Sequence, residues 1–547
     1  MFRIPDSIPK NDLPDALDQA IALEIATIPT YLYTYYSLKR SWMQKPGEDA
    51  PASSKKKYAE AYTKDQELSI KSDSNPSPNA IKLATGEGLQ YFIMTNATCE
   101  MSSQEAKDLA IEIQVYANKA AGLIMSVAVE EMLHTALSSN VKQSLFGKIE
   151  ILNLIPAFPT AVPGHEPPLP INEAKFSQEQ LITFLRIESP KAYIGQDEYS
   201  KSYIESRTIG QFYEMIENCI KDHYSDCSNY DTSRPQLLPG KGYYGPNSID
   251  TVFYDKNHTP QFPSDDDSGD LVHVHNMDSA LHALDEIVEQ GEGSSSENHL
   301  TKDGNPICPN VDWDNPDEKE GKDWDDKKKT ELSHFDKFLE AYCLGEKLLY
   351  QFNEVGLDFH SFFVFNLPTN PTNYPRQEAS TFVNYAEAKM VNPTLPYPIN
   401  SLIPNPSTEP LINVSNVTNA INTYIFLMIE ACYYQKGHTQ YEIFMFGIHK
   451  GMIWALSVLC YTMSMYEIEF QGKNSNAAAT FEPYDFGTSQ DSPKKQIQDL
   501  IKIITDEFDS IPGYTYPGGN ALDIRWVSEY VDNFPDVTLD HKVLATV

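Results

Sequence analysis

Apolar residues recur at every third or fourth position along several long stretches of the chain, which is the spacing of helices with one buried face. This spacing predicts long helices over residues 13–38, 101–146, 277–293 and 330–353. Two later apolar stretches, residues 421–435 and 441–468, predict helices that pack on the others rather than form a separate module. The pattern therefore favours a mainly α-helical protein built around four long helices.

Polar, charged or Pro-rich stretches interrupt the helical pattern and divide the chain. Three such stretches are interpreted as insertions into the helical part, at about residues 41–79, 231–275 and 294–329. We expect a helical bundle over residues 1–365. Residues 366–547 are expected to form Pro-rich loops and C-terminal helices that pack on that bundle.

Charge and composition exclude several classes of protein. The 547 residues include 42 Lys and Arg against 77 Asp and Glu, for a formal charge of −35. Such a field repels phosphate backbones, so a nucleic-acid partner is not expected. The hydrophobic share of 41% excludes wholesale disorder. The most apolar run, residues 451–466, is shorter than the roughly 20 residues that span a bilayer, so we expect no membrane span.

Cysteine usage predicts free thiols. The seven cysteines include no C-x-x-C pair, and the N-terminal residues lack the basic and apolar regions of a secretory signal. An odd, dispersed set of cysteines in such a chain indicates neither a disulfide framework nor a Cys-type zinc site. We therefore expect reduced thiols and a cytoplasmic location.

Two Glu-x-x-His pairs stand far apart in the sequence. Glu131 and His134 belong to the predicted helix 101–146, and Glu331 and His334 belong to the predicted helix 330–353. Residues three apart on a helix project from one face and can hold one metal ion. Spacing alone carries little weight, because about one such pair is expected by chance. Each pair, however, lies on or beside the apolar stripe of its helix, where burying a charge is costly unless a partner or a metal compensates it.

The other two long helices each offer a carboxylate near the core face. Glu24 lies at the border of the apolar stripe in residues 13–38. On the predicted helix 277–293, rotation by about 100° per residue places Glu292 nearer the apolar face than Glu286 or Glu289. Glu214 remains a rival for this third carboxylate, although a surface position or an indirect role suits it better.

These residues together predict a metal centre. One Glu from each of two helices plus a Glu-x-x-His pair from each of two others is the ligand set of ferritin-like di-iron and di-manganese bundles. Carboxylates and imidazoles suit iron or manganese, whereas sulfur-loving metals would require Cys. We predict a ferritin-like four-helix bundle with two irons per chain, or manganese in their place. The predicted metal ligands, which would also be the catalytic residues, are Glu24, Glu131, His134, Glu292, Glu331 and His334.

Two alternatives stay open. The six residues are also compatible with hydrogen-bonded core histidines and surface glutamates that bind no metal. Glu130, next to the first pair, is either an acceptor that orients a ligand imidazole or an ordinary helix-surface carboxylate.

The chain also resembles a family, the ferritin-like domain of the iminophenyl-pyruvate dimer synthase group, which is attached to violacein- and rebeccamycin-type bisindole pathways. The segments that carry the resemblance are LEIATIPTYLYTYYS (23–37), EEMLHTALSSN (130–140), FLRIESP (184–190), TIGQFYEMI (208–216), IVEQGEG (287–293) and ELSHFDKF (331–338). The resemblance implies a functional constraint on Glu292. It also includes Glu188, for which a structural hydrogen bond to a loop is an equal explanation.

Three departures limit what the resemblance implies. Ile25 stands where the family often has His, Gln211 stands where it would carry Glu, and the acidic insertion before His334 is unusually long. Relatives that couple two imines are long proteins of which this domain is one part. Dimer synthesis is therefore not carried over to this chain, and a fold alone does not determine a function.

The leading functional hypothesis is a non-haem dimetal oxidase or oxygenase. It would act with O2 on a small organic substrate, with secondary metabolism as one setting. The alternatives are oxidative coupling of amino-acid-derived imines, as in the resembled family, and a non-catalytic iron-binding or ferritin-like scaffold protein. The substrate and the oligomeric state are not readable from the sequence, and a homodimer is one option.

Overall fold

A computed structural model describes residues 7–39, 93–190, 192–196, 203–205, 207–238, 271–291, 299–309, 333–373, 383–385, 387–393, 409–448, 450–464, 466–509 and 525–544. The insertion expected at 41–79 lies outside these residues. So do Glu292 and Glu331 and most of the other two insertions.

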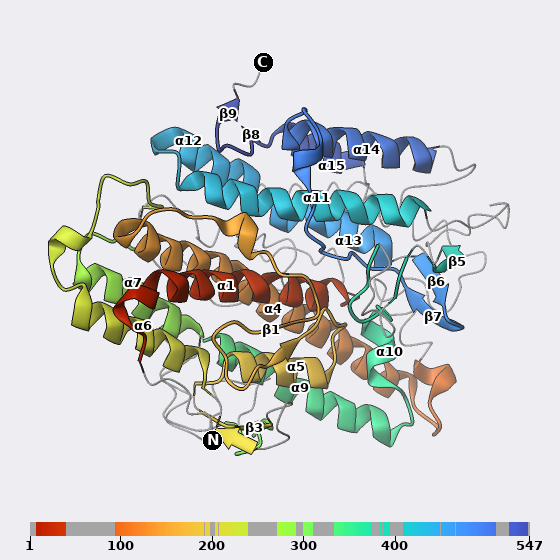
Figure 1. Ribbon diagram of the computed structural model, residues 1–547. Coiled ribbons are helices and arrows are strands. Elements are labelled where there is room, and N and C mark those ends of the chain that lie inside the picture. Colours follow the sequence, from red (N-terminus) through yellow and green to blue (C-terminus); the bar gives the residue numbers. More distant parts are fainter. Residues whose placement is uncertain are drawn as a thin grey trace, which may run out of the picture.

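Four long helices form the bundle that the apolar spacing predicts (Figure 1). They are α1 (Leu13–Tyr36), α4 (Ser103–Leu145), α7 (Met277–Gly291) and α9 (His334–Glu354). The longest, α4, packs against the other three. It begins at a capping box in which Ser102 and Glu105 satisfy each other's backbone N–H groups.

Two shorter helices close one side of the bundle. Helix α5 (Gln178–Ile187) packs on α9, and α6 (Ile209–His223) packs on α7 and α1. A second capping box starts α6, where Gln211 accepts a hydrogen bond from the Thr208 N–H and the Thr208 hydroxyl accepts one from the Gln211 N–H. Gln211, the residue that departs from the resembled family, therefore acts as a helix cap.

The C-terminal helices lie as a layer along the bundle, beside α1 and α4 (Figure 1). The layer contains α11 (Glu409–Cys432), α12 (Gly437–Glu442), π-helical turns η6 (Ile443–Ile448) and η7 (Gly451–Ala455), α13 (Leu456–Ser464), α14 (Pro493–Asp509) and α15 (Arg525–Asp532). Hydrogen bonds tie it to the bundle: Tyr433 Oη donates to the Ala136 carbonyl at 2.9 Å, and Gln143 Nε2 donates to the Tyr433 carbonyl at 2.9 Å.

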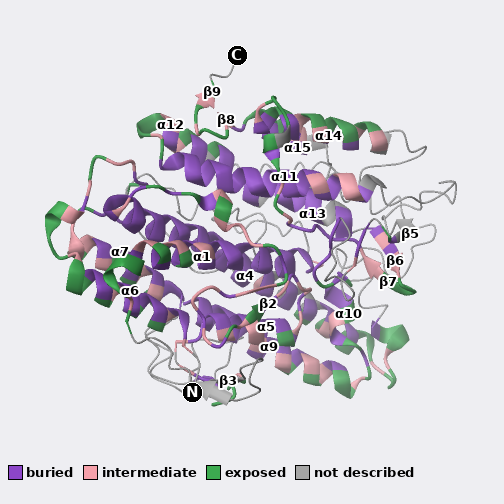
Figure 2. Ribbon diagram, viewed as in Figure 1, coloured by how far each residue is buried: buried purple, intermediate pink, exposed green. Residues whose placement is uncertain are grey.

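This layer explains why α1 is buried on nearly all sides (Figure 2). Tyr36, at the last turn of α1, contacts the Met452 carbonyl and the Ser457 hydroxyl, each at 3.3 Å. A single apolar stripe, as expected from the sequence, therefore understates the buried surface of α1. With more of the chain in the core, the polar atoms of α1 must find partners inside the protein.

The remaining described elements are short. They are η1 (Lys10–Asp12), η3 (Ile151–Leu154), η4 (Cys227–Asn229), α10 (Phe359–Phe363), η8 (Phe486–Thr488) and the antiparallel pairs β1–β2 (Thr160–Ala161, Pro170–Ile171), β3–β4 (Ile194–Gln196, Tyr203–Glu205) and β8–β9 (Asp536–Val537, Val543–Leu544). One three-stranded antiparallel sheet contains β5 (Lys389–Pro393), β6 (Tyr466–Phe470) and β7 (Lys473–Asn476). The helix predicted over 441–468 is therefore wrong at its end, because Tyr466–Phe470 pairs with two strands.

The cysteines are not all free thiols. The expectation of free thiols throughout is wrong, because Cys308 and Cys343 form a disulfide that joins the segment before α9 to α9 itself. The other five cysteines are free.

One segment, Lys119–Leu145 of α4, has the length and apolar character of a membrane-crossing helix. Its most apolar stretch is wholly buried inside the protein, as in a core helix.

Candidate metal centre

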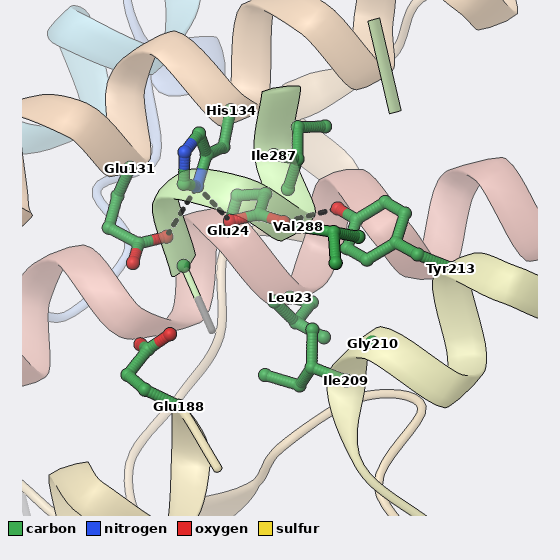
Figure 3. Close-up of a pocket in the computed structure, with 11 residues that line it drawn as sticks. Leu23, Glu24, Glu131, His134, Glu188, Ile209, Gly210, Tyr213, Ile287 and Val288 are labelled. Carbon is green, nitrogen blue, oxygen red and sulfur yellow. Dashed lines mark hydrogen bonds and ion pairs between the residues drawn. The ribbon is translucent and has the colours of Figure 1, made fainter. Parts of the chain in front are cut away.

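Five ionisable side chains from four parts of the bundle converge in its interior. They are Glu24 of α1, Glu131 and His134 of α4, Glu188 directly after α5, and His334, the first residue of α9. All five are buried. Figure 3 shows that Glu24, Glu131, His134 and Glu188 surround one cavity. The structure therefore brings together four of the six predicted ligands and adds Glu188.

The helix start at His334 differs from the prediction. Ser333 is the N-cap of α9, has extended backbone, and its side chain accepts a hydrogen bond from the Asp336 N–H at 3.2 Å. The predicted helix start at residue 330 is therefore wrong, because α9 begins at His334. Glu331 lies outside the described residues, as does Glu292 just beyond the end of α7, so both remain predictions as ligands.

The two histidines are arranged alike. In His134, Nε2 lies 3.0 Å from Gln290 Oε1, while Nδ1 lies 3.6 Å from Glu24 Oε2 and 3.9 Å from Glu131 Oε2. In His334, Nε2 lies 2.9 Å from Glu130 Oε2, while Nδ1 lies 3.0 Å from Glu131 Oε1. Each ring thus turns Nδ1 toward the carboxylates at the centre and Nε2 toward an outer acceptor, and the ring centroids are 5.0 Å apart. An outer acceptor at Nε2 leaves the lone pair of a neutral imidazole on Nδ1, where a metal would bind.

Several polar atoms at the centre lack a hydrogen bond. Glu131 Oε2 and His334 Nδ1, which face the centre, are fully buried without a hydrogen bond of acceptable geometry to any described atom. His334 Nε2 has no such hydrogen bond either, but it lies 2.9 Å from the Glu130 carboxylate, with which it makes an ion-pair contact. Buried polar atoms are nearly always satisfied, because leaving them unpaired is costly. Ligand atoms of Glu131, His134 and His334 lie within 4.8 Å of one another, so one cation could contact all three. These residues therefore fit a metal ion.

The electrostatics of the cluster also favour a cation. Burial raises the pKa of Glu131 well above its usual range, and the carboxylates of Glu24 and Glu188 add to that effect. Burial alone would lower the pKa of His334, but contacts with Glu130, Glu131 and Glu188 outweigh burial and raise it well above the usual range. The surrounding carboxylates thus favour positive charge at this position, which is the condition a bound metal ion satisfies.

Glu130 and Lys337 form a buried ion pair behind His334. Lys337 Nζ lies 2.7 Å from Glu130 Oε1 and 2.5 Å from Oε2. Burial alone would raise the pKa of Glu130, but Lys337 and His334 outweigh it and lower the pKa to about 2. Of the two interpretations of Glu130, the geometry agrees with an acceptor that orients the imidazole of His334.

Two buried tyrosines donate hydrogen bonds to two of the central carboxylates. The Tyr213 hydroxyl donates to Glu24 Oε1, and the Tyr31 hydroxyl donates to Glu188 Oε1. Burial and the neighbouring carboxylates raise the pKa of both phenols well above the usual value, so both stay protonated. Burial alone would raise the pKa of Glu24, but its interactions with His134, Glu131 and Tyr213 outweigh burial and lower the pKa overall.

The other carboxylates that the sequence offered as the third ligand do not lie in this cluster. Glu214 and Glu289 are exposed, and half-buried Glu286 lies 3.8 Å from the ring of His282. Glu188 is the residue that sequence reasoning undervalued. It sits at the C-cap of a ten-residue helix, where helical periodicity says nothing about direction, and the resemblance of RIESP was the signal that pointed to it.

Comparison with known proteins agrees with this geometry. A family profile described as Ferritin-like matches residues 17–342, which is more than half of the chain. The chain belongs to the ferritin-like family. The matched residues include the five converging side chains, most of α1 and the first part of α9. No curated protein and no solved structure matches the chain.

Proposed function

We propose that this ferritin-like chain is a non-haem dimetal oxidase or oxygenase, with two irons, that acts with O2 on a small organic substrate. The observation that carries the proposal is the convergence of three buried carboxylates and two imidazoles around unsatisfied polar atoms. A scaffold without metal would leave these atoms unpaired at a cost of roughly 1–3 kcal/mol each.

The chain's own residues divide between two metal positions. Glu24 and His134 would hold one ion, and Glu188 and His334 the other. Glu131 would be shared, because Oε1 lies on the side of His334 and Oε2 on the side of His134. Glu292 and Glu331 would supply the remaining carboxylate or carboxylates.

The surrounding residues prepare the site for oxidation chemistry. When bound, iron would supply the electrons that activate O2. Gln290 and Glu130 orient the two imidazoles, and Tyr213 and Tyr31 keep phenol protons beside Glu24 and Glu188. Leu23, Ile209 and Ile287 line the cavity and exclude bulk water.

The direct test is the reaction of the iron-loaded protein with O2. Protein loaded anaerobically with Fe(II) should bind about two irons per chain, consume O2 and change its optical spectrum. Absence of bound metal would favour the scaffold, whereas continued uptake of many irons would favour storage. Imine coupling is tested separately by supplying an amino-acid-derived imine with O2 and measuring the coupled product.

Carboxylate variants test the ligand assignment. Glu188→Gln, Glu292→Gln and Glu331→Gln should each be compared with Glu286→Gln, which alters a carboxylate outside the centre. We expect Glu188→Gln and Glu292→Gln to lower metal binding more than Glu286→Gln. The reverse order would remove Glu188 and Glu292 from the ligand set.

A further inference from the structure

The cavity at the metal centre approaches the protein surface at one place among the residues that line it. Eleven described residues line the cavity, and nine of them are buried. The two half-buried ones are Gly210, in the first turn of α6, and Val288, in the last turn and a half of α7. Helices α6 and α7 pack against each other, so an opening of the cavity among its described lining residues would lie between these two helices.

The wall between this opening and the carboxylates is apolar. Leu23, Ile209 and Ile287 lie along it, and none of the eleven lining residues is Lys or Arg. Figure 3 shows Ile209 and Gly210 on one side of the cavity and Glu131 and His134 on the other. Before it reached the metals, an anion entering here would lose its hydration along a wall that offers no cationic side chain.

The cavity is also narrow. It holds about 10 Å³ of space, on the order of one water molecule. Tyr213 occupies one wall, and its hydroxyl is held by Glu24. A diatomic molecule or a slim apolar group matches this space, whereas a bulky or charged group does not.

We propose that Gly210 and Val288 frame the entry by which O2 and a slim, uncharged group of the substrate reach the metals. This inference rests on the proposed function, because it assumes that the cavity is a reaction site. Such an entry favours substrates that are apolar or that present an apolar end to the metals. Amino-acid-derived substrates that must bring a carboxylate to the metals are disfavoured by the same lining.

The test uses nitric oxide as an uncharged diatomic probe and azide as an anionic probe of similar width, each mixed with the Fe(II)-loaded protein in a stopped-flow instrument. Gly210→Leu and Val288→Phe should narrow the opening and slow nitric oxide association by about tenfold with iron content unchanged. In the wild type, azide should associate more slowly than nitric oxide. Iron content is measured first on every variant.

Matched controls lie on the same helices but outside the cavity. Glu214→Leu on α6 and Glu289→Phe on α7 place the same side chains at exposed positions and should leave both association rates unchanged. Equal nitric oxide rates in wild type, Gly210→Leu and Val288→Phe, with iron retained, would overturn the entry route. A wild-type protein that binds no iron would instead overturn the proposed function.

A smaller side chain at the opening tests the inference even if Gly210→Leu and Val288→Phe fold poorly. Val288→Ala shortens the side chain at the opening without adding bulk, so nitric oxide association should be faster than in wild type. An unchanged rate in Val288→Ala, with iron retained, would contradict a role for Val288 at the entry.

Discussion

Nε2 of His334 lies 2.9 Å from Oε2 of Glu130, and this contact turns the other ring nitrogen toward the carboxylates at the centre. Glu130 can pair with the imidazole there because a buried lysine, Lys337, holds its carboxyl group in the ionised form. The orientation of a candidate metal ligand thus depends on an ion pair that itself contacts no metal.

Breaking this ion pair should destabilise the protein. Lys337→Met leaves the Glu130 carboxylate buried without its cation, and the expected loss in unfolding free energy is about 3–5 kcal/mol. The double variant Glu130→Gln/Lys337→Met removes both charges and should recover most of the loss. Urea unfolding of the apo proteins measures both. Lys495→Met, which breaks an exposed pair with Asp499, is the control and should cost about 0–1 kcal/mol. A double variant as unstable as Lys337→Met would contradict this account.

Gln290 should affect metal affinity through His134. Gln290→Leu removes the acceptor at His134 Nε2, so the imidazole loses its fixed orientation and metal affinity should fall by roughly 10–100-fold. Gln290→Glu keeps an acceptor and should retain affinity. Titration of the apo protein with Mn(II) or Fe(II) gives the dissociation constants. Equal affinities in wild type and Gln290→Leu would show that Gln290 does not orient His134.

A histidine outside the metal centre should make stability depend on pH. Burial lowers the pKa of His165 to about 4, although its contact with the Pro167 carbonyl partly offsets this. The unfolded chain, with a histidine pKa of about 6.5, therefore binds a proton before the folded protein does. The contribution of neutral His165 to stability is full above about pH 6.5 and is lost as the pH falls toward 4.

The size of that contribution follows from the pKa difference. Between pH 7 and pH 5, the loss of unfolding free energy should be about 2 kcal/mol smaller in His165→Gln than in wild type. The exposed His282→Gln serves as the control and should follow the wild type. The same pH dependence in wild type and His165→Gln would exclude this histidine as the source.

The disulfide should stabilise α9 against unfolding. Cys308 and Cys343 are 35 residues apart, and closing a loop of this length is worth about 3–4 kcal/mol in the chain-entropy account. Cys308→Ser should therefore lower the melting temperature, and a reductant should lower that of the wild type but not of the variant. Cys99→Ser, which alters an exposed free thiol, is the control. A reductant effect of equal size in Cys308→Ser would point to another cause.

Much of the bundle follows from periodicity, because each of its helices carries a long apolar stripe. Glu24, Glu131 and His134 were placed correctly on helices α1 and α4 for this reason. His334 was also placed at the centre, but the start of its helix was not, because Ser333 caps α9 and periodicity does not mark caps. Interactions between distant segments were missed. The Cys308–Cys343 disulfide, the outer acceptor Gln290 and the position of Glu188 depend on packing that no local pattern encodes.

Metal content per chain tests the central claim most directly. Mass spectrometry on protein purified without chelators and loaded with Fe(II) should find about two irons in wild type and in the control His282→Ala. His134→Ala and His334→Ala should each lose at least one of them, because each removes one imidazole from the centre. Wild-type iron content in both variants, or no stoichiometric iron in the wild type, would contradict the assignment of these buried carboxylates and imidazoles to a metal centre.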